Sequence, residues 1–328
     1  MPRSSVTVRS VFHSPRYFLF FFLVLLCPAL HWAVAPAYGS QPLNVVVTLP
    51  VLKDWAQQIG GPHVGVTSLM TGYESEHTYS PKPSDLVAVR KAQILIEVGA
   101  GLEVWVSTLV KNAGNPRLQT VTASRGIELL EDHDDAPGMQ AGAGSPHSHS
   151  HGNPHVWLDP GGASVMVRQI ADAFIAADPA HREQYEANAA AYLSQLHRTG
   201  EALRLRLETV SDRRIVVHHP AWPYFARYFG LIVAGTLLTQ PGAEPSARRI
   251  QAMVTTIKQA GIRVIVSEAQ LNQKLPQVLA RETGARVVVL TTLPGALPGT
   301  ETYLDMLRYN VLQLADALEK PTERGSHP

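Results

Sequence analysis

Histidine side chains are concentrated in one stretch of this chain, between Glu131 and Pro160. The first part of the stretch is rich in small residues and carries four histidines: His133, His147, His149 and His151. Neutral imidazole is the most common metal ligand among the side chains, and histidine-rich tracts are typical of metal binding. Composition alone favours metal capture and a solvated linker about equally, so the rest of the chain must decide.

A fifth histidine of this stretch, His155, has a very different setting. It belongs to the segment from Asn153 to Pro160, Asn-Pro-His-Val-Trp-Leu-Asp-Pro, which is stiff and partly apolar. Asp159 can cap a helix N-terminus, and Pro160 fits the first turn of that helix. We therefore expect His155 on a rigid support directly before a helix, preceded by a loose tether with the other four histidines.

Two more histidines follow predicted strands. His77 lies in a turn-rich loop after the strand 64–69, and His219 directly follows the strand 214–218. In open α/β sheets, ligands bind at the carboxyl ends of the strands. No regular spacing links the three histidines, so each one alone is also compatible with a turn or packing role.

The composition and the N-terminal sequence limit the class of partner and the cellular compartment of the protein. The net charge is +1 and charged residues make up 17% of the chain, a balance that gives no long-range attraction to nucleic acid. Three arginines, an apolar run at 17–27 and small residues at 33–40 are typical of a secretory signal peptide. We predict a cleavable signal at residues 1–39 and a mature protein that is periplasmic or otherwise extracytoplasmic.

The only cysteine, Cys27, lies inside this predicted signal. Leu26 before it is not the small residue that a lipoprotein signal needs, so cleavage is favoured over lipidation. The mature chain would then hold a metal only through nitrogen and oxygen ligands.

Strands and helices alternate through the rest of the chain, which is the signature of parallel sheets with helical crossovers. Residues 178–210 show an apolar seam of one long helix. We predict two α/β lobes, at residues 40–177 and 211–328, each a mainly parallel sheet with flanking helices. The helix 178–210 would join them rigidly, the histidine-rich loop 133–152 would belong to the first lobe, and a metal site would lie in the cleft between lobes.

Four segments together resemble the metal-binding solute-binding proteins of ABC transporters that handle zinc, manganese or iron, most closely the periplasmic zinc-binding type. These segments run from Gly72 to Asp85, from Gly99 to Trp105, from Asn153 to Pro160 and from His219 to Leu231. The resemblance extends in order from about Leu43 to Leu318.

By position, the resemblance implies that His77, His155 and His219 bind the metal. His218 competes for the third place, but the spacing to Tyr224 favours His219. Many relatives supply an aspartate as fourth ligand, and Thr291 stands in that place here. A threonine hydroxyl is a poor zinc ligand, so Glu76, water or a tether histidine could complete the shell.

Three neutral imidazoles suit zinc, copper or nickel better than manganese, which prefers carboxylate oxygen. We therefore expect Zn²⁺ as the bound ion, with Mn²⁺ or Fe²⁺ as alternatives. The histidines at 133, 147, 149 and 151 would capture metal weakly and raise its concentration near the cleft.

The resemblance implies a monomer that captures zinc and delivers it to an ABC permease with its ATPase subunit. The chain has no P-loop of its own and cannot power transport. Alternatives are a manganese- or iron-binding homologue, or a metal chaperone or adhesin of the same fold. A zinc-dependent hydrolase is a further alternative, because three histidines with an open fourth position also describe catalytic zinc. No H-E-x-x-H signature is present, and we expect a protein that is not an enzyme.

Overall fold

The computed structural model describes residues 41–131, 152–238 and 245–319. The predicted signal peptide at 1–39 and the four tether histidines, His133, His147, His149 and His151, lie outside these ranges.

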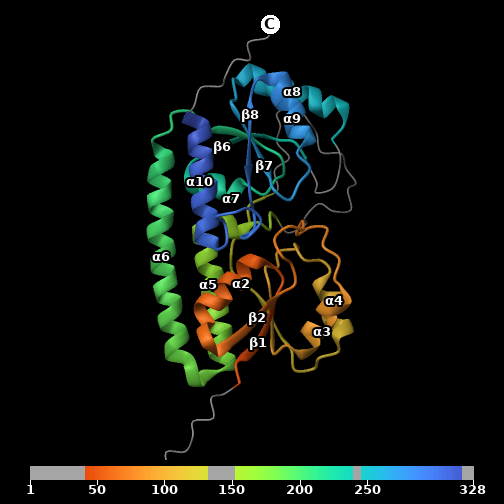
Figure 1. The fold of residues 1–328 in the computed structure, drawn as a ribbon, viewed down its shortest axis with the longest axis vertical. Coiled ribbons are helices and arrows are strands. Elements are labelled where there is room, and N and C mark those ends of the chain that lie inside the picture. Colours follow the sequence, from red (N-terminus) through yellow and green to blue (C-terminus); the bar gives the residue numbers. More distant parts are fainter. Residues whose placement is uncertain (1–40, 132–151, 239–244, 320–328) are drawn as a thin grey trace, which may run out of the picture. The chain divides into compact units, whose positions relative to one another are not determined.

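The first lobe is built on a parallel sheet with strand order β2-β1-β3-β4. Its inner strands are short runs of β-branched and other apolar residues that are buried on both faces, as expected for parallel strands under helices. The strands are β1 (Leu43–Val47), β2 (Val64–Ser68), β3 (Ile94–Glu97) and β4 (Gln119–Thr122). Helices α2 and α5 pack together on one side of the sheet, and α3 and α4 pack together on the other (Figure 1). These helices are α2 (Pro50–Gly60), α3 (Pro83–Lys91), α4 (Val106–Ala113) and α5 (Pro160–Ala177).

The second lobe repeats the arrangement, with parallel strand order β6-β5-β7-β8. The strands are β5 (Arg214–Val217), β6 (Ile232–Thr236), β7 (Val264–Glu268) and β8 (Arg286–Leu290). The helices are α7 (Pro223–Phe229), α8 (Ala247–Ala260), α9 (Lys274–Thr283) and α10 (Tyr303–Glu319). In each sheet the chain therefore moves from the second strand past the first to the third. Such a reversal places loops from neighbouring strands around a crevice.

One long helix, α6 (Arg182–Glu208), connects the lobes. It packs against α2 and α5 of the first lobe and against α7 and α10 of the second (Figure 1). The helix begins at Arg182 and not at the predicted Asp178, because Pro179–His181 forms a separate turn of 3₁₀-helix. The fold-class prediction of two parallel-sheet lobes joined by a long helix is confirmed.

Gly200, within α6, lies close to a side chain of α7. A Cβ atom at this position would lie 2.5 Å from the hydroxyl oxygen of Tyr228 in α7. A larger residue would therefore have to move α7 away from the helix or turn the side chain of Tyr228.

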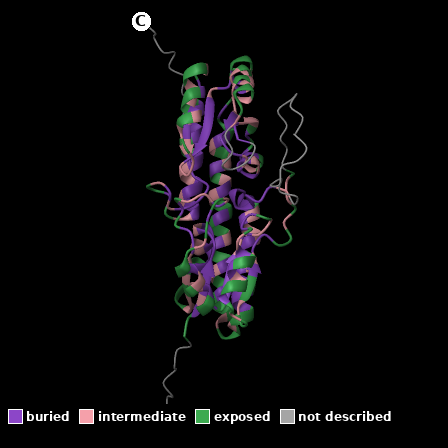
Figure 2. Ribbon diagram, turned by 90° about the vertical axis from the view of Figure 1, so that its right-hand side faces the viewer, coloured by how far each residue is buried: buried purple, intermediate pink, exposed green. Residues whose placement is uncertain are grey.

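Buried residues fill the inner strands of both sheets and the inner helix faces, while exposed residues cover the outer helix surfaces (Figure 2). The main hydrophobic core takes residues from both lobes, and a smaller one lies around α8 and α9. Buried hydrogen bonds also cross between the lobes. Trp157 Nε1 donates to the Thr292 carbonyl at 2.8 Å, and the Tyr303 hydroxyl donates to the Trp157 carbonyl at 2.6 Å. No helix in the described ranges is long and apolar enough to cross a membrane.

Candidate metal centre

The structure brings His77, His155 and His219 together. Nε2 of His77 lies 3.0 Å from Nε2 of His155 and 3.0 Å from Nε2 of His219. One ring nitrogen from each residue falls within 4.8 Å of the other two. In the part of the chain that the structure describes, this is the one group of three or more such side chains close enough to share a metal ion.

The three histidines lie in loops that follow or precede regular elements. His77 lies in the loop after β2, and His219 follows the carboxyl end of β5. His155 directly precedes a short 3₁₀-helix, η2 (Val156–Leu158), whose residues are fully buried. Asp159 then caps α5 by accepting a hydrogen bond from Gly161 N at 2.6 Å, as the sequence pattern predicts. The three imidazoles therefore come from three loops, two in the first lobe and one in the second, and meet at one point.

The distances suit a tetrahedral ion. Zinc binds imidazole nitrogen at about 2.0–2.1 Å, which places two nitrogens of a tetrahedral site roughly 3.3 Å apart. The 3.0 Å separations found here need only a few tenths of an ångström of outward movement. His155 and His219 are almost fully buried, whereas His77 is half-buried. Access to the cluster is therefore greatest on the side of His77.

A carboxylate stands beside the cluster. Glu76 is buried, its Oε1 lies 3.6 Å from His155 Nε2, and it accepts a hydrogen bond from Thr292 Oγ1 at 3.4 Å. Burial acts to raise the pKa of Glu76. The hydrogen bond with His155 and the charges of His77 and His155 outweigh burial, so its pKa lies below the ordinary value. An ionised carboxylate at this point adds negative charge and an oxygen donor to the three imidazoles.

Thr291 has its hydroxyl engaged within its own loop. It donates to the Leu293 carbonyl at 2.7 Å and accepts from Leu293 N at 3.1 Å and from Gln270 Nε2 at 3.0 Å. The next residue, Thr292, is the one that faces the cluster. The spacing along the sequence could not show which of Thr291 and Thr292 faces the cluster, because their side chains point in different directions.

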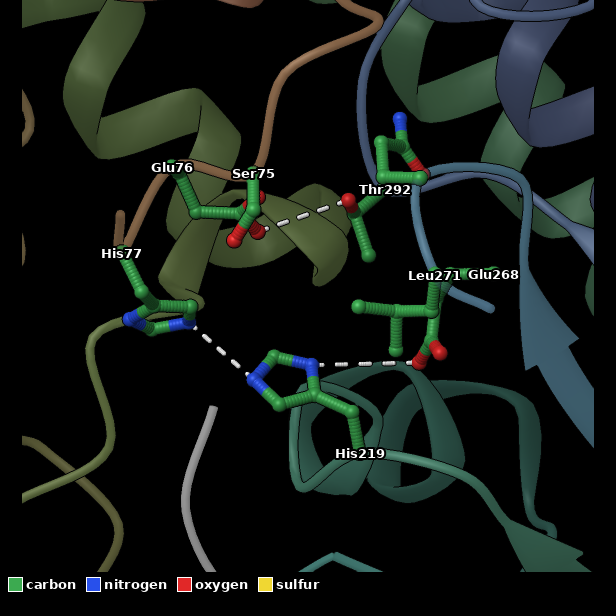
Figure 3. Close-up of a pocket in the computed structure, with 8 residues that line it drawn as sticks. Ser75, Glu76, His77, His219, Glu268, Leu271 and Thr292 are labelled. Atoms are coloured by element: carbon green, nitrogen blue, oxygen red, sulfur yellow. Dashed lines mark hydrogen bonds and ion pairs between the residues drawn. The ribbon is translucent and has the colours of Figure 1, made fainter. Parts of the chain in front are cut away.

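A small cavity, with room for about one water molecule, lies against the histidines. Figure 3 shows its lining from both lobes. The lining residues are Ser75, Glu76, His77, His219, Glu268, Gln270, Leu271 and Thr292. Several of these are polar groups that sequence reasoning does not place together, because their pairing depends on which strands are neighbours.

Glu268, at the end of β7, is the most unusual of these groups. Its Oε1 accepts a hydrogen bond from Trp222 Nε1. The same oxygen lies 3.8 Å from His219 Nδ1 (Figure 3). Its Oε2 has no hydrogen-bond partner among the described residues. Burial raises the pKa of Glu268 to about 8. The carboxyl group thus backs the ring of His219 on the side away from the cluster.

His218, the competitor for the third position, is packed inside the second lobe. Its Nδ1 lies 2.9 Å from Ser267 Oγ, and burial lowers its pKa to about 4. Its side chain is not part of the three-histidine group.

Comparisons with known proteins identify the family of this chain. A family model described as zinc-uptake complex component A, periplasmic, matches residues 45–317. The high-affinity zinc uptake system protein ZnuA of Bacillus subtilis is 28% identical over 280 residues, covering 84% of this chain and 88% of that protein. The manganese-binding lipoprotein MntA of Halalkalibacterium halodurans is 28% identical over 277 residues, covering 83% and 87%.

A crystal structure of ZnuA superimposes with a TM-score of 0.74 and 29% identity, covering 85% of this chain and all of that one. The family match extends over both lobes and all three histidines, and the resemblance drawn from the sequence is confirmed. This chain belongs to the family of the periplasmic component A of zinc-uptake complexes.

Proposed function

We propose that this protein captures zinc outside the cytoplasm with His77, His155 and His219 and delivers it to an ABC permease. The observation that carries the proposal is the convergence of three Nε2 atoms from both lobes on one point. Zinc is the cargo of the protein, and the three imidazoles are its ligands. A metal that is held by ligands from two lobes can be released when the two lobes separate slightly.

Glu76 is the proposed fourth ligand. Its carboxylate is buried beside His155 and is the nearest oxygen donor that carries a charge. The hydroxyl of Thr291 is occupied by Leu293 and Gln270 and would have to break these bonds to reach a metal. With Glu76 in place, the first lobe supplies three ligands and the second supplies His219 alone.

The donor set supports zinc over manganese or iron. Three imidazoles with one carboxylate suit zinc in a four-coordinate site, whereas manganese prefers more oxygen ligands. Sequence identity does not decide the metal, because the zinc and manganese relatives are equally identical to this chain.

The wider setting is proposed from the same family. The segment 1–39 would direct secretion and be removed, and a permease with its ATPase subunit would receive the metal from the monomer. The lobes would comprise residues 40–177 and 211–328, with 178–210 as the connecting helix. The tether histidines at 133, 147, 149 and 151 would act as accessory metal captors.

Calorimetry with zinc and with manganese on the mature chain tests the site. We expect one tightly bound zinc, lost in His155→Ala and retained when residues 134–152 are deleted. His197→Ala, a change of an exposed histidine on α6, is the matched control and should bind like the wild type. If the deletion abolishes binding and His155→Ala does not, the tether is the true site. Tighter manganese than zinc would contradict the choice of metal.

Two further assays test the role. Co-purification with a permease from the native membrane separates a transport component from a metal chaperone or adhesin. A hydrolysis assay of the zinc-loaded protein on ester, peptide and β-lactam substrates should give no turnover above that of free zinc.

A further inference from the structure

Asn153 lies between two of the histidine loops. Its Oδ1 is 3.0 Å from the backbone N of His155 and 2.9 Å from Nδ1 of the same residue. Its Nδ2 donates to the carbonyl of Pro220 at 2.6 Å. Pro220 directly follows His219, so one buried amide contacts a histidine loop from each lobe.

The orientation of this amide is fixed by its partners. The Pro220 carbonyl can only accept a hydrogen bond, so it must face the amide nitrogen of Asn153. The backbone N–H of His155 can only donate, so it must face the amide oxygen. Both groups require the same orientation of the Asn153 amide, and neither depends on the protonation state of the imidazole ring.

A fixed amide determines the tautomer of His155. Because Oδ1 of Asn153 only accepts, Nδ1 of His155 must carry a proton. In the neutral ring, Nε2 then carries the lone pair. Nε2 is the atom that lies 3.0 Å from His77 Nε2 in the three-histidine group. In the neutral ring, this lone pair therefore points at the place where a metal would bind.

The backbone of Asn153 is held from the second lobe as well. The hydroxyl of Tyr224, in α7, donates to the Asn153 carbonyl at 2.9 Å and accepts from Leu130 N at 2.8 Å. Asn153 N donates in turn to the Leu130 carbonyl at 2.8 Å. These contacts leave the amide little freedom to turn away from Pro220 or His155.

We infer that Asn153 is a positioning residue of the metal site, which presets His155 in its metal-binding tautomer under the control of the His219–Pro220 loop. The inference rests on the proposed function, since it assigns a role toward the same ion. It also gives a physical link between the lobes. A shift of the second lobe that breaks the contact with Pro220 frees the amide, and with it the ring of His155.

Two measurements test this inference. The first is ¹⁵N NMR of the His155 ring in the metal-free wild type, which should show the proton on Nδ1. The second is zinc affinity by chelator competition for Asn153→Ala and Asn153→Asp. Asn153→Ala should mix the tautomers and weaken zinc binding by about 10- to 100-fold, the usual cost of removing a partner behind a metal-binding histidine. Asn153→Asp keeps the acceptor for Nδ1 of His155 but loses the donor to the Pro220 carbonyl, so it should restore the Nδ1–H tautomer and give a zinc affinity between those of Asn153→Ala and the wild type.

A purely structural role would give a different pattern. Thermal unfolding of the metal-free variants reports loss of stability separately, and Tyr224→Phe removes the backbone support while leaving the amide in place. A proton on Nε2 in the metal-free wild type overturns the inference, even if Asn153→Ala fails to fold. Wild-type zinc affinity in a folded Asn153→Ala overturns it too. Failure of the wild type to bind zinc would instead sink the proposed function, and the NMR result would still decide the tautomer.

Discussion

Glu76 Oε1 lies 3.6 Å from Nε2 of His155, and both side chains are almost completely buried. The two residues come from different loops of the same lobe, one after β2 and one before η2. The first lobe thus concentrates three donors, Glu76, His77 and His155, and His219 completes the group from the second lobe.

Replacing Glu76 with glutamine should weaken zinc binding by about 10- to 100-fold, because the change removes the charge and keeps the size of the side chain. The lowered pKa of Glu76 means that the wild-type carboxylate is charged at neutral pH. Chelator competition measures the loss, and Glu183→Gln on the exposed face of α6 is the matched control. Equal zinc affinity in Glu76→Gln and the control would remove Glu76 from the ligand set.

Replacing Thr291 with aspartate should destabilise the metal-free protein by about 1–3 kcal/mol, because a buried carboxylate would face the Leu293 carbonyl that the hydroxyl now serves. Gln270 and Leu293 N remain as donors to it. The side chain at 291 points into its own loop and Thr292 faces the cluster, so the preference for zinc over manganese should stay that of the wild type. Thermal unfolding with and without each metal gives both results. Thr291→Ser keeps the hydroxyl and should behave like the wild type, and an unchanged stability of metal-free Thr291→Asp would contradict the prediction.

Much of this fold follows from local sequence. The β-branched runs predict the strands, and the Asp159-Pro160 pair predicts the start of α5. The position of His219 at a strand end, and that of His77 in the loop after a strand, follow from the same pattern, because parallel strands end on one edge. Such features depend only on neighbours along the chain.

The contacts behind the histidines could not be predicted in this way. The approach of Glu268 to His219 requires β7 to lie beside β5, and the sequence does not state strand order. The bond from Asn153 to Pro220 joins residues 67 positions apart in different lobes. The direction in which Thr291 points depends on a turn that its own hydroxyl closes.

The stability of the metal-free protein should depend on pH through the carboxyl group of Glu103. Burial raises the pKa of Glu103 to about 7, despite hydrogen bonds from Thr48 Oγ1, Val98 N and Gly99 N. Below the unfolded value of 4.5 both states hold the proton, so the group has no effect. Between 4.5 and about 7 only the folded state holds it, so the free energy of unfolding falls as pH rises, by about 3 kcal/mol in total.

Urea unfolding of metal-free Glu103→Gln and wild type at pH 4.5 and pH 7.5 measures this contribution. The difference between the two proteins should change with pH, whereas Glu128→Gln, at an exposed position, should follow the wild type at both values. A parallel pH dependence in Glu103→Gln and wild type would show that Glu103 titrates normally.

Gly200→Ala should lower stability although alanine is the better helix former by about 1 kcal/mol. The new Cβ would lie 2.5 Å from the Tyr228 hydroxyl oxygen, so α6 and α7 must move apart or Tyr228 must turn. Overpacking of this kind costs about 1–3 kcal/mol, which outweighs the gain in helix propensity. Thermal unfolding of Gly200→Ala should therefore show a lower midpoint. Adding Tyr228→Phe removes the clashing oxygen. The double variant should therefore have a higher unfolding midpoint than Tyr228→Phe alone. A stabilised Gly200→Ala would mean that the contact between α6 and α7 yields without cost.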